Sequence, residues 1–223
     1  MAKTFGVQDA LAALGITTTY FEIQDYNPDL QADIAEVKTR LGARVAAAEK
    51  AYNERTEYAL TLKAKDPDGQ TLVLTLGGTG TAGLVLTRAV VRQVNTDYAT
   101  VQLTGHLHSG ANAATGHLAA PLSQEITTPS LGFGVIAVQL GGTLADCQSS
   151  ELTYSVEHTD MPNNAGAFLV GASHGLLIEG TEEYVDDGSP ITIASPFTQL
   201  SQATREGNTG LVSRIIRGRK VAA

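Results

Sequence analysis

The stretch Tyr58-Ala-Leu-Thr-Leu-Lys-Ala-Lys65, followed by Asp66-Pro-Asp-Gly69 and Thr71-Leu-Val-Leu-Thr-Leu76, decides the fold class. Apolar and polar side chains alternate in its first part, which is the period of a strand with one face in a core. Its middle part carries the aspartate, proline and glycine that favour a tight turn. The sequence therefore predicts a hairpin of two antiparallel strands.

Further strand patterns follow this hairpin, at residues 84–94, 98–108, 134–140, 151–158, 175–179 and 210–216. They do not alternate with amphipathic helices, so a sheet built of βαβ units is not expected. The prediction is a mainly β protein whose strands form an antiparallel β-sandwich or barrel. Residues 109–130 are rich in Ala, Ser, Thr and Gly without periodicity, which predicts a long surface loop that binds a partner or becomes ordered on assembly.

One helix is expected on the N-terminal side of residue 57. Asn27, Pro28 and Asp29 have the chemistry of a helix start, with a cap, a first-turn proline and an acid at the positive end of the helix dipole. Apolar residues then recur at steps of three and four as far as Tyr52. This spacing predicts one long amphipathic α-helix at about residues 28–55, packed against the sheet or covering a neighbouring subunit.

Length and composition limit the class of protein. The 223 residues, 43% of them hydrophobic, are sufficient for one β-rich domain over residues 1–223, with the helix near its start and a basic segment at 205–223. A single cysteine, Cys147, excludes an internal disulfide framework and favours synthesis in a reducing cytoplasm. No export signal and no membrane span are expected. The net charge of −8 argues against general nucleic-acid binding.

Charge is segregated along the chain. The 112 residues between Arg92 and Arg205 contain eleven acids and no lysine or arginine, whereas residues 205–223 contain five cations and one acid. Opposite charges at separate places steer the association of one subunit with another. The predicted assembly elements are the basic, apolar C-terminal segment and an acidic cluster: Leu211, Val212, Arg214, Ile215, Ile216, Arg217, Arg219 and Lys220 on one side, Glu182, Glu183, Asp186 and Asp187 on the other. Truncation after Gly210 is expected to prevent assembly without unfolding the subunit.

The glycine-rich run Gly78-Thr-Gly80-Thr-Ala-Gly83 matches the pattern of a dinucleotide-binding loop. In that fold the loop follows the first strand of a βαβ unit and opens a helix. Here the following segment is dense in β-branched residues, which favour a strand. A nucleotide-binding enzyme therefore stays an alternative to the main interpretation.

His106 and His108 are the best candidates for a metal site. Alternate residues of a strand face the same way, so both imidazoles can reach one ion, and His117, His158 or an acid can complete its shell. Solvated or hydrogen-bonded histidines are the favoured interpretation, and no metal is predicted, because no known zinc spacing is present. No cofactor and no catalytic residue is predicted: no nucleophile elbow and no distinctive Ser/His/Asp arrangement is evident, and Cys147 lacks a cationic neighbour.

The segment Ser150-Glu-Leu-Thr-Tyr-Ser-Val-Glu-His-Thr-Asp-Met-Pro-Asn-Asn-Ala-Gly-Ala-Phe-Leu-Val-Gly171, with the strand after it, resembles the tail tube (major tail) proteins of bacteriophages and related contractile systems. The resemblance covers about a third of the chain. It implies a β-sandwich that closes into hexameric rings and stacks as a tube in the virion, after assembly in the host cytoplasm. The long predicted helix departs from that pattern.

The expected function is therefore that of a structural virion protein that associates with itself and with other virion proteins. An acidic lumen would repel phosphates and let DNA pass without specific binding. Sheath, connector, decoration and capsid roles remain open beside the tail tube. The alternatives are the nucleotide-binding enzyme, with its loop at Gly78–Gly83, and a soluble ligand-binding β module.

Overall fold

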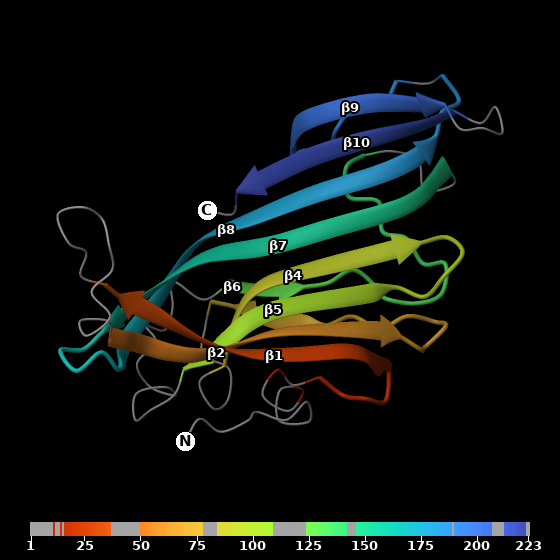
Figure 1. Ribbon diagram of the computed structural model, residues 1–223. Helices are drawn as coiled ribbons and strands as arrows, with labels where there is room; N and C mark the ends of the chain where they lie inside the picture. The colour runs from red at the N-terminus through yellow and green to blue at the C-terminus, as the bar shows by residue number, and fades with distance from the viewer. Residues whose placement is uncertain are drawn as a thin grey trace.

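The computed structural model describes residues 11, 14, 16–36, 50–77, 84–108, 124–141, 146–188, 190–206 and 212–221. Within them the chain forms ten strands (Figure 1), which are β1 (Phe21–Ala35), β2 (Lys50–Ala64), β3 (Val73–Leu76), β4 (Leu84–Val94), β5 (Thr100–His108), β6 (Gln124–Thr127), β7 (Cys147–Pro162), β8 (Phe168–Val185), β9 (Thr198–Glu206) and β10 (Val212–Val221). Eight of these strands make one sheet in the order β1-β2-β5-β4-β7-β8-β10-β9, and β3 pairs with β6 in a second sheet.

All neighbouring strands run antiparallel, which confirms the predicted mainly β, antiparallel fold class. The period-two pattern explains the arrangement: Leu60, Leu62 and Ala64 of β2 alternate with more polar residues and face the core. The small sheet supplies Leu74 and Leu76 of β3 to the same cluster. The two sheets therefore share one hydrophobic core.

A second, smaller core lies under the strands of the C-terminal half. It contains Ile136, Leu140, Cys147, Tyr184 and Ile216, and it is flanked by the half-buried Val138, Ile191, Ile193 and Phe197. Ile216 belongs to β10, which lies between β8 and β9 in the sheet. Residues 212–221 of the basic C-terminal segment are thus built into the sheet.

The predicted helix at 28–55 is wrong for its first and last parts. Residues 28–35 belong to β1 and residues 50–55 to β2, which pair with each other, while residues 37–49 lie outside the described residues. The spacing of Leu30 and Ile34 explains the error, because residues four apart lie on one face of a strand as well as on one face of a helix. Pro28 is tolerated since β1 lies at the sheet edge, where a missing N–H breaks no ladder.

The predicted hairpin is correct in its strands and wrong in its pairing. Residues 67–68 form a turn, and Gly69 adopts a positive φ of 85°. However, β2 pairs with β5 and not with β3, which crosses to the small sheet. The loop predicted at 109–130 contains β6, whereas residues 109–123 lie outside the described residues. Residues 134–140, predicted as a strand, are irregular. In the described part of the chain, no helix is long and apolar enough to cross a membrane.

Candidate functional site

The hairpin of β7 and β8 extends beyond its neighbours at one end of the main sheet (Figure 1). Pairing of β7 with β4 ends at Arg88 and Ser155, but β7 and β8 stay paired as far as Pro162 and Phe168. The hairpin then reaches β2, where the Asn53 N–H donates to the Gly166 carbonyl over 2.6 Å. The end of the hairpin is therefore seated on a strand that is not its neighbour in the sheet.

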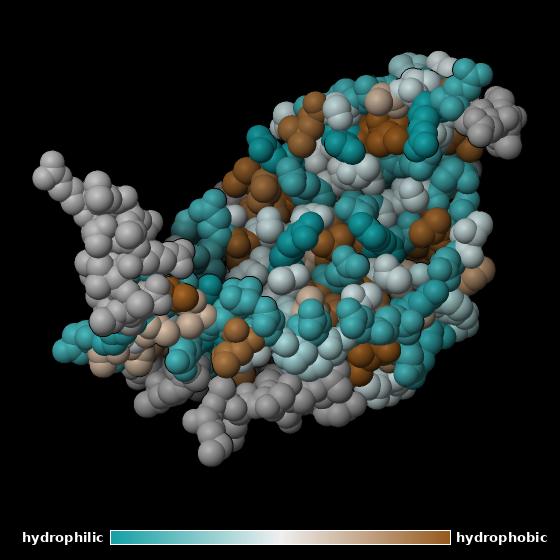
Figure 2. Space-filling model, in the orientation of Figure 1, coloured by the Kyte–Doolittle hydropathy of each residue, from teal (hydrophilic) through white to brown (hydrophobic). Residues whose placement is uncertain are grey.

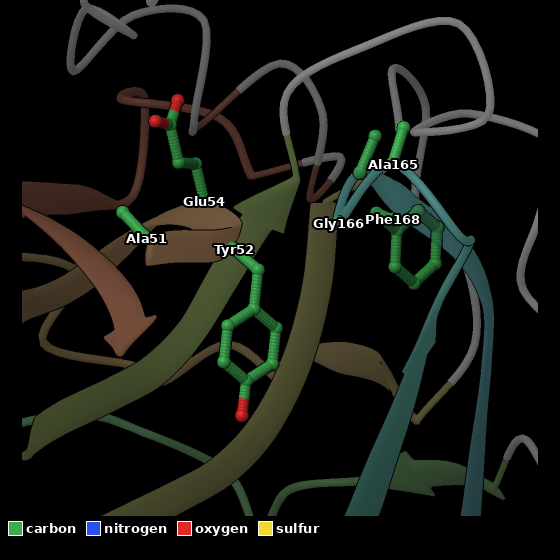
Figure 3. A pocket seen from close by; sticks show the side chains of 7 residues that line it. Ala51, Tyr52, Glu54, Ala165, Gly166 and Phe168 are labelled. Atoms are coloured by element: carbon green, nitrogen blue, oxygen red, sulfur yellow. The ribbon is translucent and has the colours of Figure 1, made fainter. Parts of the chain in front are cut away.

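A shallow hollow lies beside this contact, between Ala51, Tyr52 and Glu54 of β2 and residues 165–168 of the hairpin (Figure 3). Gly166 has a positive φ of 82°, and a Cβ there would lie 2.8 Å from the Cβ of Tyr52. Only glycine accommodates both this backbone conformation and this close approach. The hollow could not be predicted from the sequence, because its two walls come from distant segments.

Three histidines and one aspartate meet where the hairpin contacts β5. His106 and His108 are two residues apart on β5, and His158 and Asp160 are two apart on β7, so each pair lies on one face of its strand. Asp160 Oδ1 lies 2.9 Å from His158 Nε2 and 3.0 Å from His108 Nε2. One side-chain nitrogen or oxygen of each of the four residues lies within 4.8 Å of those of the others.

The cluster is enclosed and held by further contacts. Phe168 stacks on the His108 ring at 3.8 Å between centroids, and Ser173 Oγ lies 2.5 Å from His158 Nδ1. Burial favours the neutral form of Asp160, but hydrogen bonds from His108 and His158, with the charge of nearby imidazoles, outweigh it and hold the pKa of this carboxyl well below its ordinary value. Asp160 is therefore an anion at neutral pH.

The sequence predicted part of this cluster. It placed His106 and His108 together and offered His158 or an acid as further ligands, and the structure brings these groups together. His117 lies outside the described residues. Asp160 was not singled out, although His158-Thr-Asp160 repeats the two-residue spacing of His106-Leu-His108.

The structure also brings a serine, a histidine and an aspartate into contact, which the sequence did not reveal. Ser173, His158 and Asp160 form a hydrogen-bonded chain. Ser173 has 0% of its surface exposed, so its hydroxyl cannot meet a substrate. A nucleophile must reach the bond that it attacks, and this arrangement is better suited to orienting the imidazole.

The predicted assembly elements lie side by side in one chain. In the register of β8 with β10, Glu182 is opposite Ile216 and Glu183 is opposite Ile215. Arg214 forms an ion pair with Asp186 of the same chain. Leu211 lies outside the described residues. Four further predicted residues belong to β10, namely Val212, Arg217, Arg219 and Lys220, and Asp187 follows the end of β8. Arg214 and Asp186 are thus engaged within the subunit, whereas a role of the exposed Arg217 and Arg219 between subunits stays a prediction.

Glu182 is a buried structural residue, unlike the exposed acid expected of an assembly surface. Its side chain is 0% exposed, and it accepts hydrogen bonds from the backbone N–H groups of Gln139 (2.5 Å) and Leu140 (3.1 Å) and from the Tyr184 hydroxyl. It ties the irregular segment at 134–141 to β8. Truncation after Gly210 would remove β10, whose Ile216 belongs to the smaller core, so from the structure we expect the shortened subunit to be destabilised as well as impaired in assembly.

The segregation of charge along the sequence is not kept on the exposed face of the sheet. Arg92 of β4 pairs with Glu151 of β7 over 2.6 Å, and Arg217 of β10 lines a hollow together with Glu151 and Glu179. Cations from both ends of the chain are thus interleaved with acids from its middle. The acidic lumen stays a prediction, and other surfaces of the subunit would have to line it.

The main sheet has two edges. In the described part of the chain, no strand pairs with the outer side of β1 or of β9. Every residue of β9 is exposed, Leu200 among them, and Leu30 and Ile34 of β1 have 59% and 60% of their surface exposed. Figure 2 shows small, separate apolar groups on a mostly hydrophilic face. The edges are therefore the most distinctive surfaces for association.

The other candidate sites gain no support. The glycine-rich loop at 78–83 lies outside the described residues, but β4 follows it directly, where a dinucleotide-binding loop would open a helix. Cys147 is buried, and burial, reinforced by the charge of Glu182, raises the pKa of its thiol to about 12. No protein-family model matches the chain, and a search of curated proteins found no match.

Proposed function

We propose that this protein is a self-assembling structural subunit of a virion, and that it forms the stacked rings of a bacteriophage tail tube. The observation that supports the proposal is the open eight-stranded sheet, with strands of fifteen and nine residues at its edges. An edge strand offers a row of backbone N–H and C=O groups to another chain. Such an edge is completed most simply by the edge of a second copy.

The two edges differ, which favours rings over two-fold dimers. β1 carries the four acids Glu22, Asp25, Asp29 and Asp33, whereas the two charged residues of β9, Arg205 and Glu206, have opposite signs. Contact of β9 in one subunit with β1 in the next is heterologous, and repetition of a heterologous contact closes a ring or continues as a filament. The tail tube, and a ring of six subunits, come from the resemblance of residues 150–171. Other virion proteins would be the further partners, and DNA would pass through without specific binding.

The first test is the assembly state of the full chain, measured by light scattering after size exclusion and by negative-stain microscopy. We expect rings or tubes at high protein concentration. A single small species, such as a monomer or a dimer, at every concentration would refute the proposal and would favour a ligand-binding module.

The second test separates the edges from the rest of the surface. Leu200→Lys places a charge on β9, which is a natural way of blocking edge pairing, and should reduce assembly without changing the circular dichroism. Val94→Lys is the matched control, because Val94 is also partly exposed but lies at the end of an interior strand. Equal assembly of both variants would show that β9 is not the contact.

A further inference from the structure

We propose that His106, His108, His158 and Asp160 form a structural binding site for a divalent transition-metal ion, zinc above all, that fastens the β7–β8 hairpin onto β5. The proposal rests on the convergence of four ligand side chains from two strands in one buried or half-buried cluster. It does not depend on the proposed role in a virion.

The donor set fits zinc. Three imidazole nitrogens and one carboxylate oxygen are ligands that Zn²⁺ accepts in four-coordinate sites, whereas calcium and magnesium prefer sites made of oxygens. Zinc–ligand bonds of about 2.0–2.1 Å in a tetrahedron place the ligand atoms about 3.3 Å apart. The ligand atoms here lie within 4.8 Å of one another, so small side-chain rotations would close the shell.

The groups around the four ligands are those expected of a metal site. With the metal on His158 Nε2, the Nδ1–H donates to Ser173 Oγ, which fixes the tautomer and the orientation of the ring. Phe168 holds the plane of the His108 ring. The Asp160 side chain is 11% exposed, so an ion can reach the cluster from that side.

The ion would have a mechanical consequence. It would link β5 to the part of β7 that extends beyond its pairing with β4. The hairpin is held at its end by the bond from Asn53 to Gly166, and the metal would add a second fastening along its length. Removal of the ion should therefore loosen residues 157–175 more than the rest of the chain.

The test uses full-length protein without a histidine tag, freed of metal by dialysis and titrated with Zn²⁺ and then with Co²⁺. We expect about one ion per chain, with the visible absorption of tetrahedral Co²⁺. Asp160→Asn and His158→Gln should each weaken binding at least about tenfold. His174→Ala is the control, because His174 is an exposed histidine of β8 paired with Glu157, and it should bind metal like the wild type.

A second measurement keeps the proposal testable if a substitution prevents folding. Hydrogen exchange of wild-type protein should slow in residues 157–175 on addition of Zn²⁺, with little change in β9. A folded wild-type protein that takes up no stoichiometric Zn²⁺ or Co²⁺ would overturn the proposal. So would binding by Asp160→Asn and His158→Gln that equals that of the His174→Ala control.

Discussion

Replacement of Glu182 is expected to destabilise the protein more than replacement of any other acid of the 182–187 cluster. Its carboxylate is fully buried and accepts hydrogen bonds from Gln139, Leu140 and Tyr184. In Glu182→Gln the amide oxygen can still accept the backbone bonds, and the amide nitrogen can face the tyrosine. The charge assistance and the acceptor of the Tyr184 hydroxyl are lost, at a cost of about 1–3 kcal/mol.

Glu182→Leu should cost more, about 3–5 kcal/mol, because the two N–H groups and the hydroxyl would remain without an acceptor in a buried place. An apolar replacement of a buried charge is harmless only when its partners are replaced as well. Two of the partners here are backbone groups, which substitution cannot remove. The loss would be a large part of the roughly 5–15 kcal/mol that stabilises a typical domain.

The assay is urea unfolding followed by far-ultraviolet circular dichroism, since the chain has no tryptophan to report on the core. Glu183→Gln and Glu183→Leu are the matched controls. Glu183 is the next residue of β8, only half-buried, and its variants should stay within about 0.5 kcal/mol of the wild type. Equal stability losses at the two positions would refute the assignment of Glu182 as the anchor of the 134–141 segment.

Two further results follow from the packing. Gly105→Ala should lower the free energy of unfolding in urea by about 2–4 kcal/mol, since a Cβ there would collide with the Val85 carbonyl and the Tyr58 hydroxyl. Thr104→Ala is the control: Thr104 lies on the exposed face, and its replacement should be near neutral. Cys147 should be alkylated at pH 8 about a thousandfold more slowly than a free thiol, because a pKa raised to about 12 leaves little thiolate; fast alkylation of the folded protein would contradict this environment.

Whether a strand could be predicted from the sequence pattern depended on where that strand lies in the sheet. β4 occupies the residues 84–94 that the pattern predicted, because an interior strand buries a dense apolar run. β9 was not predicted. Its nine residues are exposed on both faces, so no side chain is selected for burial and no period appears. An edge strand of this kind is specified by its partner β10 and by backbone bonds.

The cluster beneath the hairpin shows a different limit of prediction. The spacing of two residues places His106 beside His108, and local geometry is enough for that inference. His158 and Asp160 follow from nothing local, because β4 lies between β5 and β7 in the sheet. Only the course of the hairpin past the end of its pairing with β4 brings the two strands into contact. The arrangement of charge could not be predicted from the sequence either, since β10, which carries the C-terminal cations, pairs with the acidic strand β8.

Asn53 is the place where the hairpin and an edge of the sheet meet. Its backbone N–H holds the Gly166 carbonyl, and its side-chain amide donates to Asp33 of β1 over 3.0 Å. Arg55, two residues further along β2, also contacts Asp33, at 3.3 Å. Anything that loosens the hairpin, such as loss of the proposed metal, would therefore disturb the contacts that Asn53 makes with β1. β9 has no such contact in the register, because it pairs with β10, and β10 pairs with residues 177–185 of β8 and not with the part of the hairpin that the metal would hold. If subunits join β9 to β1, metal removal should therefore change the β1 side of each contact and leave the β9 side unchanged.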